Sequence, residues 1–306
     1  DGTLGLKAIK AEGGITFAQD NSAKFPSMPK NAYESGYADF MLTPEGIAKE
    51  LTDLAEIPYP VLPSDKVASS HLQQLDGEKE ILKKILSVVK SKTGTDFFTN
   101  YKQASIYRRI VRRVALHKLA TLEEYAALLA NNEREVEELY NDFLINVTNF
   151  FRDTDFYKSL SNEFIPAMIK GRNSADALRI WVAGCATGEE AYSIAITLDE
   201  YIENKKLDIS YQIFASDLDA NAIEKARLGI YSVSAVHNIP QERLKKFFRK
   251  TDGHYQVNKS IREVCIFSKQ NLLNDPPFCR MDLISWQNVL IYLENDAQQK
   301  ILQTFH

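Results

Sequence analysis

Short apolar runs alternate with amphipathic stretches along the second half of the chain. The run Ile180 to Ala183 is too short for a buried helix and predicts a parallel strand that is covered on both faces. From Glu189 to Leu198, apolar residues recur three and four positions apart, which predicts a helix. A second helix is expected from about Ala220. Three further runs predict strands of the same sheet: Gln212 to Ser216, Val264 to Phe267 and Met281 to Ser285.

The first 144 residues follow a different pattern. From Glu78 to Leu144, the apolar residues form stripes at helical spacing, which predicts an all-helical region. Ile57 to Gly77 contains prolines and serines with little periodicity and is interpreted as a linker. Before it, the pattern predicts helices and short strands in this order: Asp1 to Gly13 (helix), Ile15 to Gln19 (strand), Ala32 to Gly36 (helix), Ala38 to Leu42 (strand) and Pro44 to Leu54 (helix).

The turn between Ala183 and Glu189 predicts a ligand site. Gly184 supplies the turn, and Gly188 lets the backbone pass close to a flat or charged group, because neither residue has a Cβ atom. The stretch G-C-A-T-G-E-E differs from the G-x-G-x-x-G of dinucleotide folds, and Glu189 and Glu190 stand where an anion would bind. Two carboxylates suit a ligand with hydroxyls and a positive charge, such as S-adenosylmethionine. The alternative is a helix whose first-turn acids complement its dipole.

Polar residues follow the other predicted strands. Asp217 ends the second strand, where a carboxylate can accept hydrogen bonds from both hydroxyls of a ribose. Asn271 and Leu272 follow the third strand, and Gln287 and Asn288 follow the fourth. Because the carboxyl ends of parallel strands share one edge of a sheet, we expect these residues at a single site.

Four motifs, in this order along the chain, resemble those of one family: NVTNFFRD from Asn146, AGCATGEEAYSIA from Ala183, ASDLDANAIEKARLGIYS from Ala215 and NVLIYL from Asn288. The stretch from about Glu78 to His306 is similar to the CheR family of S-adenosylmethionine-dependent protein-glutamate methyltransferases of bacterial chemotaxis. A second resemblance covers the first fifty or so residues, which are similar to the C-terminal end of the CheB family of chemoreceptor methylesterases. The chain therefore looks like part of a fusion of esterase and transferase.

These resemblances imply an α/β fold with four regions. Residues 1–55 resemble a partial doubly wound methylesterase, 56–77 a linker and 78–145 an all-helical substrate-recognition domain. Residues 146–306 resemble a Rossmann-like S-adenosylmethionine-dependent methyltransferase domain, with a small antiparallel β-subdomain at about 229–263. Within it, Leu244 to Phe248 is expected to be helical and Gly253 to Gln270 to form strands. In some family members this subdomain docks a receptor tail peptide by strand addition.

The resemblance also implies which residues act. Arg152 and Tyr292 are expected in the catalytic group, with Arg152 orienting the substrate carboxylate. A glutamate is already ionised near neutral pH, so methyl transfer to it needs positioning and desolvation rather than a general base. Phe150 and Phe151 are expected to pack between the helical and nucleotide domains. The expected cofactor contacts are Asn146, Thr148, Arg152, Gly184, Glu189, Asp217, Asn271, Leu272, Gln287 and Asn288.

An arginine-rich stretch runs from Tyr107 to Val114 in the helical region. Residues four apart share a helix face, which groups Arg108 with Arg112 and Arg109 with Arg113. Such a run is commonly a solvated face, but here it predicts a positive patch in an acidic chain. The resemblance implies that this domain grips glutamate-rich helices of a chemoreceptor. We therefore hypothesise that the four arginines bind the substrate.

The methylesterase-like residues are expected to be inactive. Asp1 matches the third member of a Ser-His-Asp triad in the resembled family, and the serine and histidine that it would orient are missing. A piece of about fifty residues also has too little core of its own. It is therefore expected to be docked on its neighbour or exchanged with a second copy of the chain.

Composition narrows the remaining choices. The net charge of -4 argues against a general nucleic-acid binder. The three cysteines lack the spacing of a zinc site or a disulfide framework, so no metal is expected. The sequence contains no apolar run near 18 residues and no secretory signal, which favours a cytoplasmic protein without membrane insertion.

One motif departs from the family pattern. Trp286 and Gln287 replace the Cys and Arg of the usual C-R-N-(V/L)-x-I-Y, while Asn288 and Tyr292 are kept. The chain also stops before the final β-hairpin of a seven-stranded methyltransferase sheet, which predicts an open sheet edge or strands supplied by another molecule. An alternative function is therefore a non-catalytic sensor of S-adenosylmethionine or S-adenosylhomocysteine. A methyltransferase for small acids is a third interpretation, in which the basic helical domain would lack a purpose.

Overall fold

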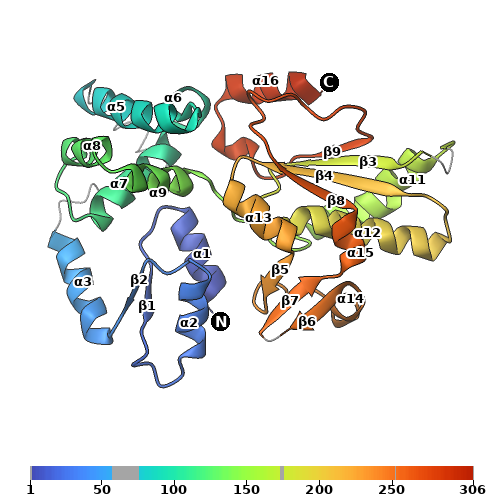
Figure 1. Ribbon diagram of the computed structural model, residues 1–306, viewed down its shortest axis with the longest axis horizontal. Helices are drawn as coiled ribbons and strands as arrows, with labels where there is room; N and C mark the ends of the chain where they lie inside the picture. The colour runs from blue at the N-terminus through green and yellow to red at the C-terminus, as the bar shows by residue number, and fades with distance from the viewer. Residues whose placement is uncertain (1, 57–75, 173–175, 252, 306) are drawn as a thin grey trace. The chain divides into compact units, whose positions relative to one another are not determined.

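The computed structural model describes residues 2–56, 76–172, 176–251 and 253–305 (Figure 1). These residues form two compact units. The first contains the residues up to 145 together with 292–298, and the second contains residues 146–291 and those from 299 onward. The fold is mixed α/β, as the sequence predicts.

A four-stranded parallel sheet forms the centre of the second unit (Figure 1). Its strands are β3 (Leu178–Ala183), β4 (Tyr211–Asp217), β8 (Cys265–Lys269) and β9 (Leu283–Ser285), in the order β8-β4-β3-β9. Ile180 of β3 pairs with Ile213 on one side and with Leu283 on the other. All four strands predicted from the apolar runs are confirmed, although β9 begins two residues later than expected.

The two faces of this sheet are covered differently. Ile180 and Val182 point into a core shared with α12 (Glu189–Lys205) and α13 (Ala220–Leu228). The alternate residue Trp181 faces the other way, because side chains alternate along a strand. Its ring packs between those of Phe278 and Phe305, at centroid distances of 5.3 and 5.0 Å. Phe305 is the last residue of α16 (Asn295–Phe305).

A small antiparallel sheet adjoins this core. Its strands are β5 (Ile230–Ser232), β7 (His254–Val257) and β6 (Phe248–Thr251), in that order, with α14 (Gln241–Phe247) and α15 (Lys259–Glu263) beside them. The predicted β-subdomain is confirmed, but the expectation of strand at α15 is wrong. Its five residues contain one apolar side chain, Ile261, which is buried, so they lack the alternation of a strand.

Phe150 belongs to the core of the second unit. Its ring lies 4.8 Å from that of Tyr231 and 5.4 Å from that of Phe248, measured between centroids. The ring partners of Phe150 therefore come from the β-subdomain, and its predicted packing against the helical domain stays a prediction. The chain then continues through α10 (Thr154–Ser159), the π-helix η1 (Leu160–Phe164) and α11 (Ile165–Ile169). A 3₁₀ turn, η2 (Leu290–Tyr292), precedes α16.

The predicted all-helical region is confirmed in the first unit. It contains α5 (Asp76–Thr93), α6 (Phe97–Asn100), α7 (Gln103–Leu116), α8 (Leu122–Ala130) and α9 (Glu133–Phe143). Ile85, Ile110 and Leu139, from three of these helices, are completely buried in one apolar core. Side chains cap three helix starts, because Asp96 accepts from the amide of Thr99, Thr121 from that of Glu124 and Asn132 from that of Glu135.

Residues 2–56, which we call the N-terminal segment, also belong to the first unit. They form α1 (Thr3–Ala11), β1 (Phe17–Gln19), α2 (Ser27–Glu34), β2 (Phe40–Leu42) and α3 (Pro44–Glu56). The strands pair in parallel, and the rings of Phe17 and Phe40 stack at 5.3 Å. The predicted order of elements is confirmed, but the second helix starts five residues earlier than expected. Asp1 and the predicted linker over 57–75 lie outside the described residues.

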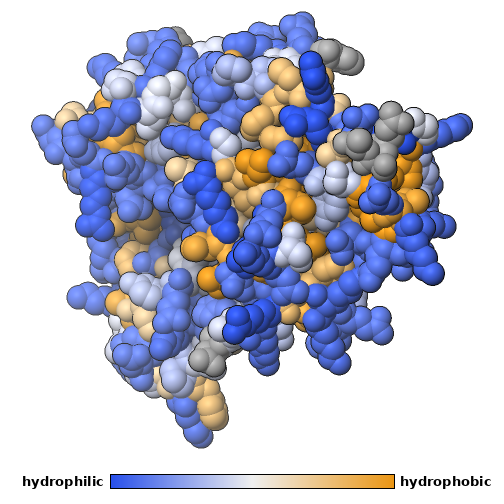
Figure 2. Space-filling view, turned by 45° about the vertical axis from the view of Figure 1, so that its right-hand side comes forward, coloured by the Kyte–Doolittle hydropathy of each residue, from blue (hydrophilic) through white to orange (hydrophobic). Residues whose placement is uncertain are grey.

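Charged and polar side chains cover much of the face drawn in Figure 2, with apolar groups between them. Several large apolar side chains are exposed singly, among them Leu228 and Ile291. Within the described ranges, no helix has the length and apolar character needed to cross a membrane.

Candidate active site

The turn after β3 is held by the neighbouring strand. The amides of Gly184 and Cys185 both donate to the carbonyl of Ser216, at 2.8 and 2.9 Å. Gly184 has a φ of +72° and Gly188 a φ of +94°, which explains the glycines. A Cβ on Gly188 would lie 2.8 Å from the Cβ of Ala226. The close approach at Gly188 is therefore to helix α13, and the expectation that it makes room for a ligand is wrong.

Gly184 is also packed against the protein. A Cβ at this position would lie 2.5 Å from Cγ2 of Val289, in the stretch that follows β9. The turn after β3 and the stretch after β9 therefore fit closely together. A cofactor contact with the Gly184 backbone stays a prediction.

Asp217 lies at the end of β4, as predicted, and contacts the glycine turn. Its Oδ2 accepts from the amide of Ala186 at 2.8 Å, and its Oδ1 accepts from the amide of Asp219 at 2.9 Å. Burial raises the pKa of Asp217 to about 6, although these amides act to lower it. The carboxylate is thus positioned by the backbone and retains lone pairs for a ligand's hydroxyls.

Asp219 connects Asn146 to the end of β4. The Nδ2 of Asn146 donates to Oδ2 of Asp219, while Oδ1 of Asp219 caps α13 by accepting from the amides of Asn221 and Ala222. Sequence reasoning missed Asp219, although its spacing of two from Asp217 and its place before a helix were visible. Thr148, two residues after Asn146, is half-buried.

The two glutamates at the start of α12 are both buried. Glu189 accepts from the hydroxyl of Thr187 at 2.6 Å, and Glu190 accepts from the hydroxyl of Ser285 at 2.5 Å. Gln287 donates to the same serine oxygen at 3.4 Å. Burial raises the pKa of Glu190 to about 7, against the lowering effects of Ser285 and Arg152.

Glu190 and Ser285 also contribute to the candidate site. Sequence reasoning named Glu190 together with Glu189 at the turn, but it missed Ser285. No local signal separates Glu190 from Glu189, because both are first-turn acids of one helix. Their difference comes from β9, which is 95 positions away in sequence and supplies Ser285.

Arg152 is exposed on the loop before α10, and its Nη1 donates to the carbonyl of Val147 at 2.9 Å. The preceding residue, Phe151, has a φ of +50°, and its amide donates to Ser193 of α12 at 3.1 Å. This backbone bond holds the loop against α12, and Arg152 lowers the pKa of Glu190 by its charge. The guanidinium is therefore near the buried carboxylates while remaining accessible.

The remaining predicted residues follow strands or lie in the first unit. Asn271 and Leu272 follow β8, and the Asn271 side chain accepts from the amide of Leu273 at 3.0 Å. Asn288 follows β9, is exposed and has a φ of +56°. Tyr292 belongs to the first unit, where its carbonyl accepts from the amide of Lys102 at 3.0 Å. The roles of these four residues stay predictions.

The sequence predicted that the four arginines of α7 form an exposed positive patch, and this prediction is wrong because their side chains are largely covered. Arg109 and Arg112 are buried, with exposed fractions of 3% and 2%. The side chains of Arg113 and Arg108 are exposed by 12% and 16%. We call these four residues the arginine face. It is buried because the N-terminal segment and α9 supply carboxylates and carbonyls to it, among them Asp39.

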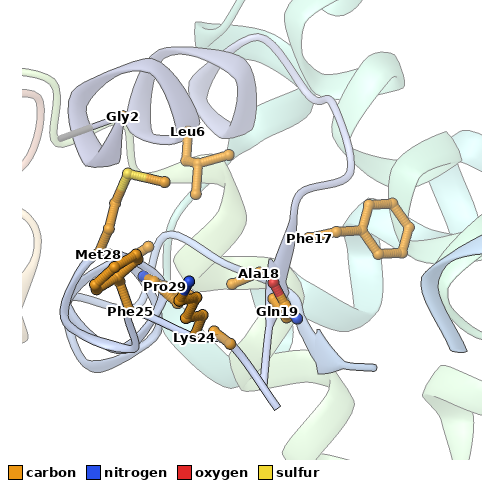
Figure 3. Close-up of a pocket in the computed structure, with 11 residues that line it drawn as sticks. Gly2, Leu6, Phe17, Ala18, Gln19, Lys24, Phe25, Met28 and Pro29 are labelled. Carbon is orange, nitrogen blue, oxygen red and sulfur yellow. The ribbon is translucent and has the colours of Figure 1, made fainter. Parts of the chain in front are cut away.

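A cavity of about 460 Å³ lies within the N-terminal segment (Figure 3). Its walls come from α1, β1, α2 and the residues between them, and include Leu6, Phe25 and Met28. Phe25 is 76% exposed and Met28 is 56% exposed. All lining residues lie between positions 2 and 32, so this cavity is not part of the site at the strand ends.

The residues at the strand ends suit a cationic nucleoside. Three carboxylates, Asp217, Glu189 and Glu190, are gathered around one glycine turn at the carboxyl edge of a parallel sheet. They can accept hydrogen bonds from hydroxyls and favour a nearby positive charge, whereas a pyrophosphate would be repelled. The fold and site define a Rossmann-like domain of the class that binds S-adenosylmethionine.

Comparison with known families identifies the class more closely. Residues 146–306 match the S-adenosylmethionine-binding domain of CheR methyltransferases, and residues 80–144 match the all-alpha domain of the same enzymes. The chain belongs to the CheR methyltransferase family, and S-adenosylmethionine is the cofactor of its second unit's domain. Residues 1–51 match the CheB methylesterase family.

Individual relatives agree with these matches. An uncharacterized 104.1 kDa protein of Rhodobacter capsulatus is 34% identical over the whole of this chain, which spans 34% of that protein. Chemotaxis protein methyltransferase 2 of Vibrio cholerae is 32% identical, over 70% of this chain and 76% of its own length. The chemotaxis protein methyltransferase of Escherichia coli is 31% identical, over 67% of this chain and 72% of its own length.

Proposed function

We propose that this chain transfers a methyl group from S-adenosylmethionine to glutamate side-chain carboxylates of a chemoreceptor-like protein, giving glutamate methyl esters. The observation that carries the proposal is the gathering of Asp217, Glu189 and Glu190 around one turn, with an exposed Arg152 whose charge acts on Glu190. The family membership and the names of the relatives support it.

The reaction needs few groups on the protein. When bound, S-adenosylmethionine supplies an electrophilic methyl group on a sulfonium. A substrate carboxylate oxygen forms the new bond to that methyl carbon while the carbon–sulfur bond breaks and its electron pair stays on sulfur. Because the carboxylate is ionised near neutral pH, the protein has to position it in line and exclude water.

Some of the described residues are proposed to hold the cofactor, and others are proposed to orient the substrate carboxylate. Asp217 is positioned by the amides of Ala186 and Asp219 to accept from the cofactor's hydroxyls. Its negative charge and that of Glu190 favour the cationic cofactor over its neutral product. The remaining proposed cofactor contacts are Asn146, Thr148, Arg152, Gly184, Glu189, Asn271, Leu272, Gln287 and Asn288.

Arg152 is the proposed orienting residue for the substrate. Its guanidinium is exposed and makes a hydrogen bond to the Val147 carbonyl, which leaves further N–H groups for a carboxylate. Tyr292 is proposed to complete the catalytic group. The proposed macromolecular partner is a glutamate-rich helix, bound through the arginine face.

The N-terminal segment is proposed to have no esterase activity. A serine nucleophile and a histidine base would have to come from elsewhere to form a triad with Asp1. The contacts of the segment with α7 favour docking on its own chain over exchange with a second copy.

A second candidate is a non-catalytic sensor of S-adenosylmethionine or its demethylated product. It is favoured by the stretch after β9, where Gln287 makes a hydrogen bond to Ser285 in place of the arginine of the family motif. A sensor would bind both molecules without transferring the methyl group.

Calorimetry with S-adenosylmethionine and S-adenosylhomocysteine, followed by a radiolabelled methyl assay on a chemoreceptor fragment, separates the two candidates. Binding together with base-labile label on the fragment supports the methyltransferase. Binding without transfer to any glutamate-rich helix supports the sensor.

A second experiment tests the role of Arg152. An Arg152→Ala variant should bind cofactor but lose at least ten-fold in methyl transfer. Arg134→Ala, on the exposed side of α9, is the matched control. Full activity of Arg152→Ala would remove Arg152 from the mechanism.

A further inference from the structure

The arginine face proposed to bind the substrate is the same surface that holds the N-terminal segment. We propose that the N-terminal segment masks the substrate surface of α7, so that it competes with a glutamate-rich helix for the same arginines. This inference rests on the proposed function of the arginine face. It makes the N-terminal segment an intramolecular competitor for the substrate surface.

Arg112 lies at the centre of the contact. Its side chain is 2% exposed and donates to Asp39 of the N-terminal segment and to Asp142 of α9, one carboxylate for each terminal nitrogen. Its Nε donates to the carbonyl of Gly14 at 3.1 Å. The segment therefore supplies two of the three groups that neutralise or solvate this guanidinium, and α9 supplies the third.

The end of α1 approaches the same face. Arg109 donates to the carbonyl of Ala11 at 2.5 Å, and the side chain of Glu12 lies 3.7 Å from Nη2 of Arg108. The carbonyls at the C-terminus of a helix lack partners within the helix and carry its partial negative charge. The segment thus presents two carboxylates and two carbonyls to the arginines. A substrate helix rich in glutamate would present the same chemistry.

A second contact lies at the end of α7. Lys118 binds Glu50 and Asp53 of α3, both at 2.9 Å, and its own side chain is 45% exposed. The two apolar cores identified in the described part of the chain contain no residue of the N-terminal segment. Ion pairs and hydrogen bonds attach the segment to the helical domain, and a different set of carboxylates can replace the segment in such contacts.

Burial sets the condition for this exchange. Arg112 cannot lose Asp39 without a replacement, because an unpaired charge in this position is strongly disfavoured. Burial acts to raise the pKa of Asp39, but Arg112 and Lys10 hold it below its ordinary value, so the carboxylate is ionised. An incoming glutamate would take over this place. We therefore expect the mask to open to acidic helices and to stay closed otherwise.

The direct test weakens the mask in the 306-residue chain and measures binding of a synthetic helical peptide with four glutamates on one face. Glu50→Gln with Asp53→Asn removes the exposed contact to Lys118, and Asp39→Asn removes the charge that faces Arg112. Fluorescence anisotropy should show at least three-fold tighter peptide binding for the double variant and at least ten-fold for Asp39→Asn. Glu133→Gln, which removes the exposed partner of Lys92 inside the helical domain, is the matched control and should change nothing.

A covalent lock gives the opposite perturbation and does not depend on a destabilised variant. Glu50→Cys and Lys118→Cys, in a Cys279→Ser background because Cys279 is exposed, are joined by a short bis-maleimide. The locked chain should lose peptide binding by at least ten-fold while its affinity for S-adenosylmethionine, measured by calorimetry, stays unchanged. Equal peptide binding by locked and unlocked chains would overturn the masking proposal.

The outcomes also separate this inference from the function on which it rests. If the unlocked chain and its variants bind the peptide with one affinity, the mask is wrong and the proposed function stands. If none of them binds the peptide, the proposed substrate class is wrong and the mask falls with it. If Asp39→Asn binds the peptide more weakly than the natural chain, Asp39 assists the substrate instead of blocking it, which also overturns the mask.

Discussion

Two buried charged regions of this molecule differ in how their charges are compensated. On α7, Arg112 and Arg113 each face carboxylates at hydrogen-bonding distance. At the strand ends, Glu190 is buried and Asp217 is half-buried, their donors are a hydroxyl and amides, and burial raises the pKa of each. The first region is neutralised by the folded chain itself, whereas the hydrogen bonds of Glu190 and Asp217 within the described residues come from neutral hydroxyl and amide donors. Charges that the fold leaves poorly compensated point to a ligand, while charges that it neutralises point to an interface.

The largest expected effect comes from breaking the neutralised region. Replacing Arg112 by methionine would leave Asp39 and Asp142 buried without their guanidinium, which should cost about 3–5 kcal/mol of unfolding free energy. Chemical denaturation would measure it. The control is Lys92→Ala, at an exposed ion pair with Glu133, for which about 0–1 kcal/mol is expected. Similar losses for the two variants would contradict the contrast between the regions.

At the strand ends, removing a buried charge should raise the unfolding free energy instead of lowering it. The pKa of Glu190 is about 7 in the folded chain against an ordinary 4.5, so ionisation destabilises the fold as pH rises from about 4.5 to 7. Glu190→Gln should therefore increase the unfolding free energy by up to about 3 kcal/mol at pH 8 and leave it unchanged at pH 4. Thermal unfolding at both values tests this, with the exposed Glu203→Gln as control. A stability loss at pH 8 would show that the ionised carboxylate is already compensated.

We expect Asp217 to contribute to the affinity for S-adenosylmethionine. Asp217→Asn should weaken S-adenosylmethionine binding by about 2 kcal/mol, roughly thirty-fold, because a charged acceptor of the cofactor's hydroxyls is lost. With the pKa of Asp217 raised to about 6, affinity of the natural chain should also fall as pH drops below that value. Calorimetry between pH 5 and 8 would show both effects. An affinity independent of pH and of this substitution would place the cofactor elsewhere.

The smallest expected effect lies at the rim of the arginine face. Lys118→Ala removes two ion pairs whose lysine is exposed, so the unfolding free energy should change by less than about 1 kcal/mol. Screening predicts that 1 M salt abolishes most of this difference. A loss as large as that for Arg112 would mean that the rim and the centre of the face contribute alike.

The sequence predicted the sheet well because its signals are local. The apolar runs of β3, β4 and β8 are short and bounded by polar residues, and Asp217 is the last residue of its strand. The motif resemblance then located most candidate site residues in one domain.

The environment of the arginines could not be predicted in the same way. Spacing along α7 shows which arginines share a face, but it does not show what covers that face. Asp39, which pairs with Arg112, is 73 positions away in a region that matches a different family. The same limit applies to Glu190, whose partner Ser285 is 95 positions away. Long-range pairing, rather than residue type, decided which charges are buried.

The ring cluster around Phe305 has a practical consequence. The chain contains two tryptophans, Trp181 and Trp286, and both rings pack edge-on against Phe305, at centroid distances of 5.0 and 5.2 Å. Trp286 belongs to the stretch after β9 that also carries Gln287 and Asn288. Intrinsic fluorescence therefore reports on the seating of the last helical turn and on this stretch at the same time. Ligand titrations can be followed optically without attaching a dye.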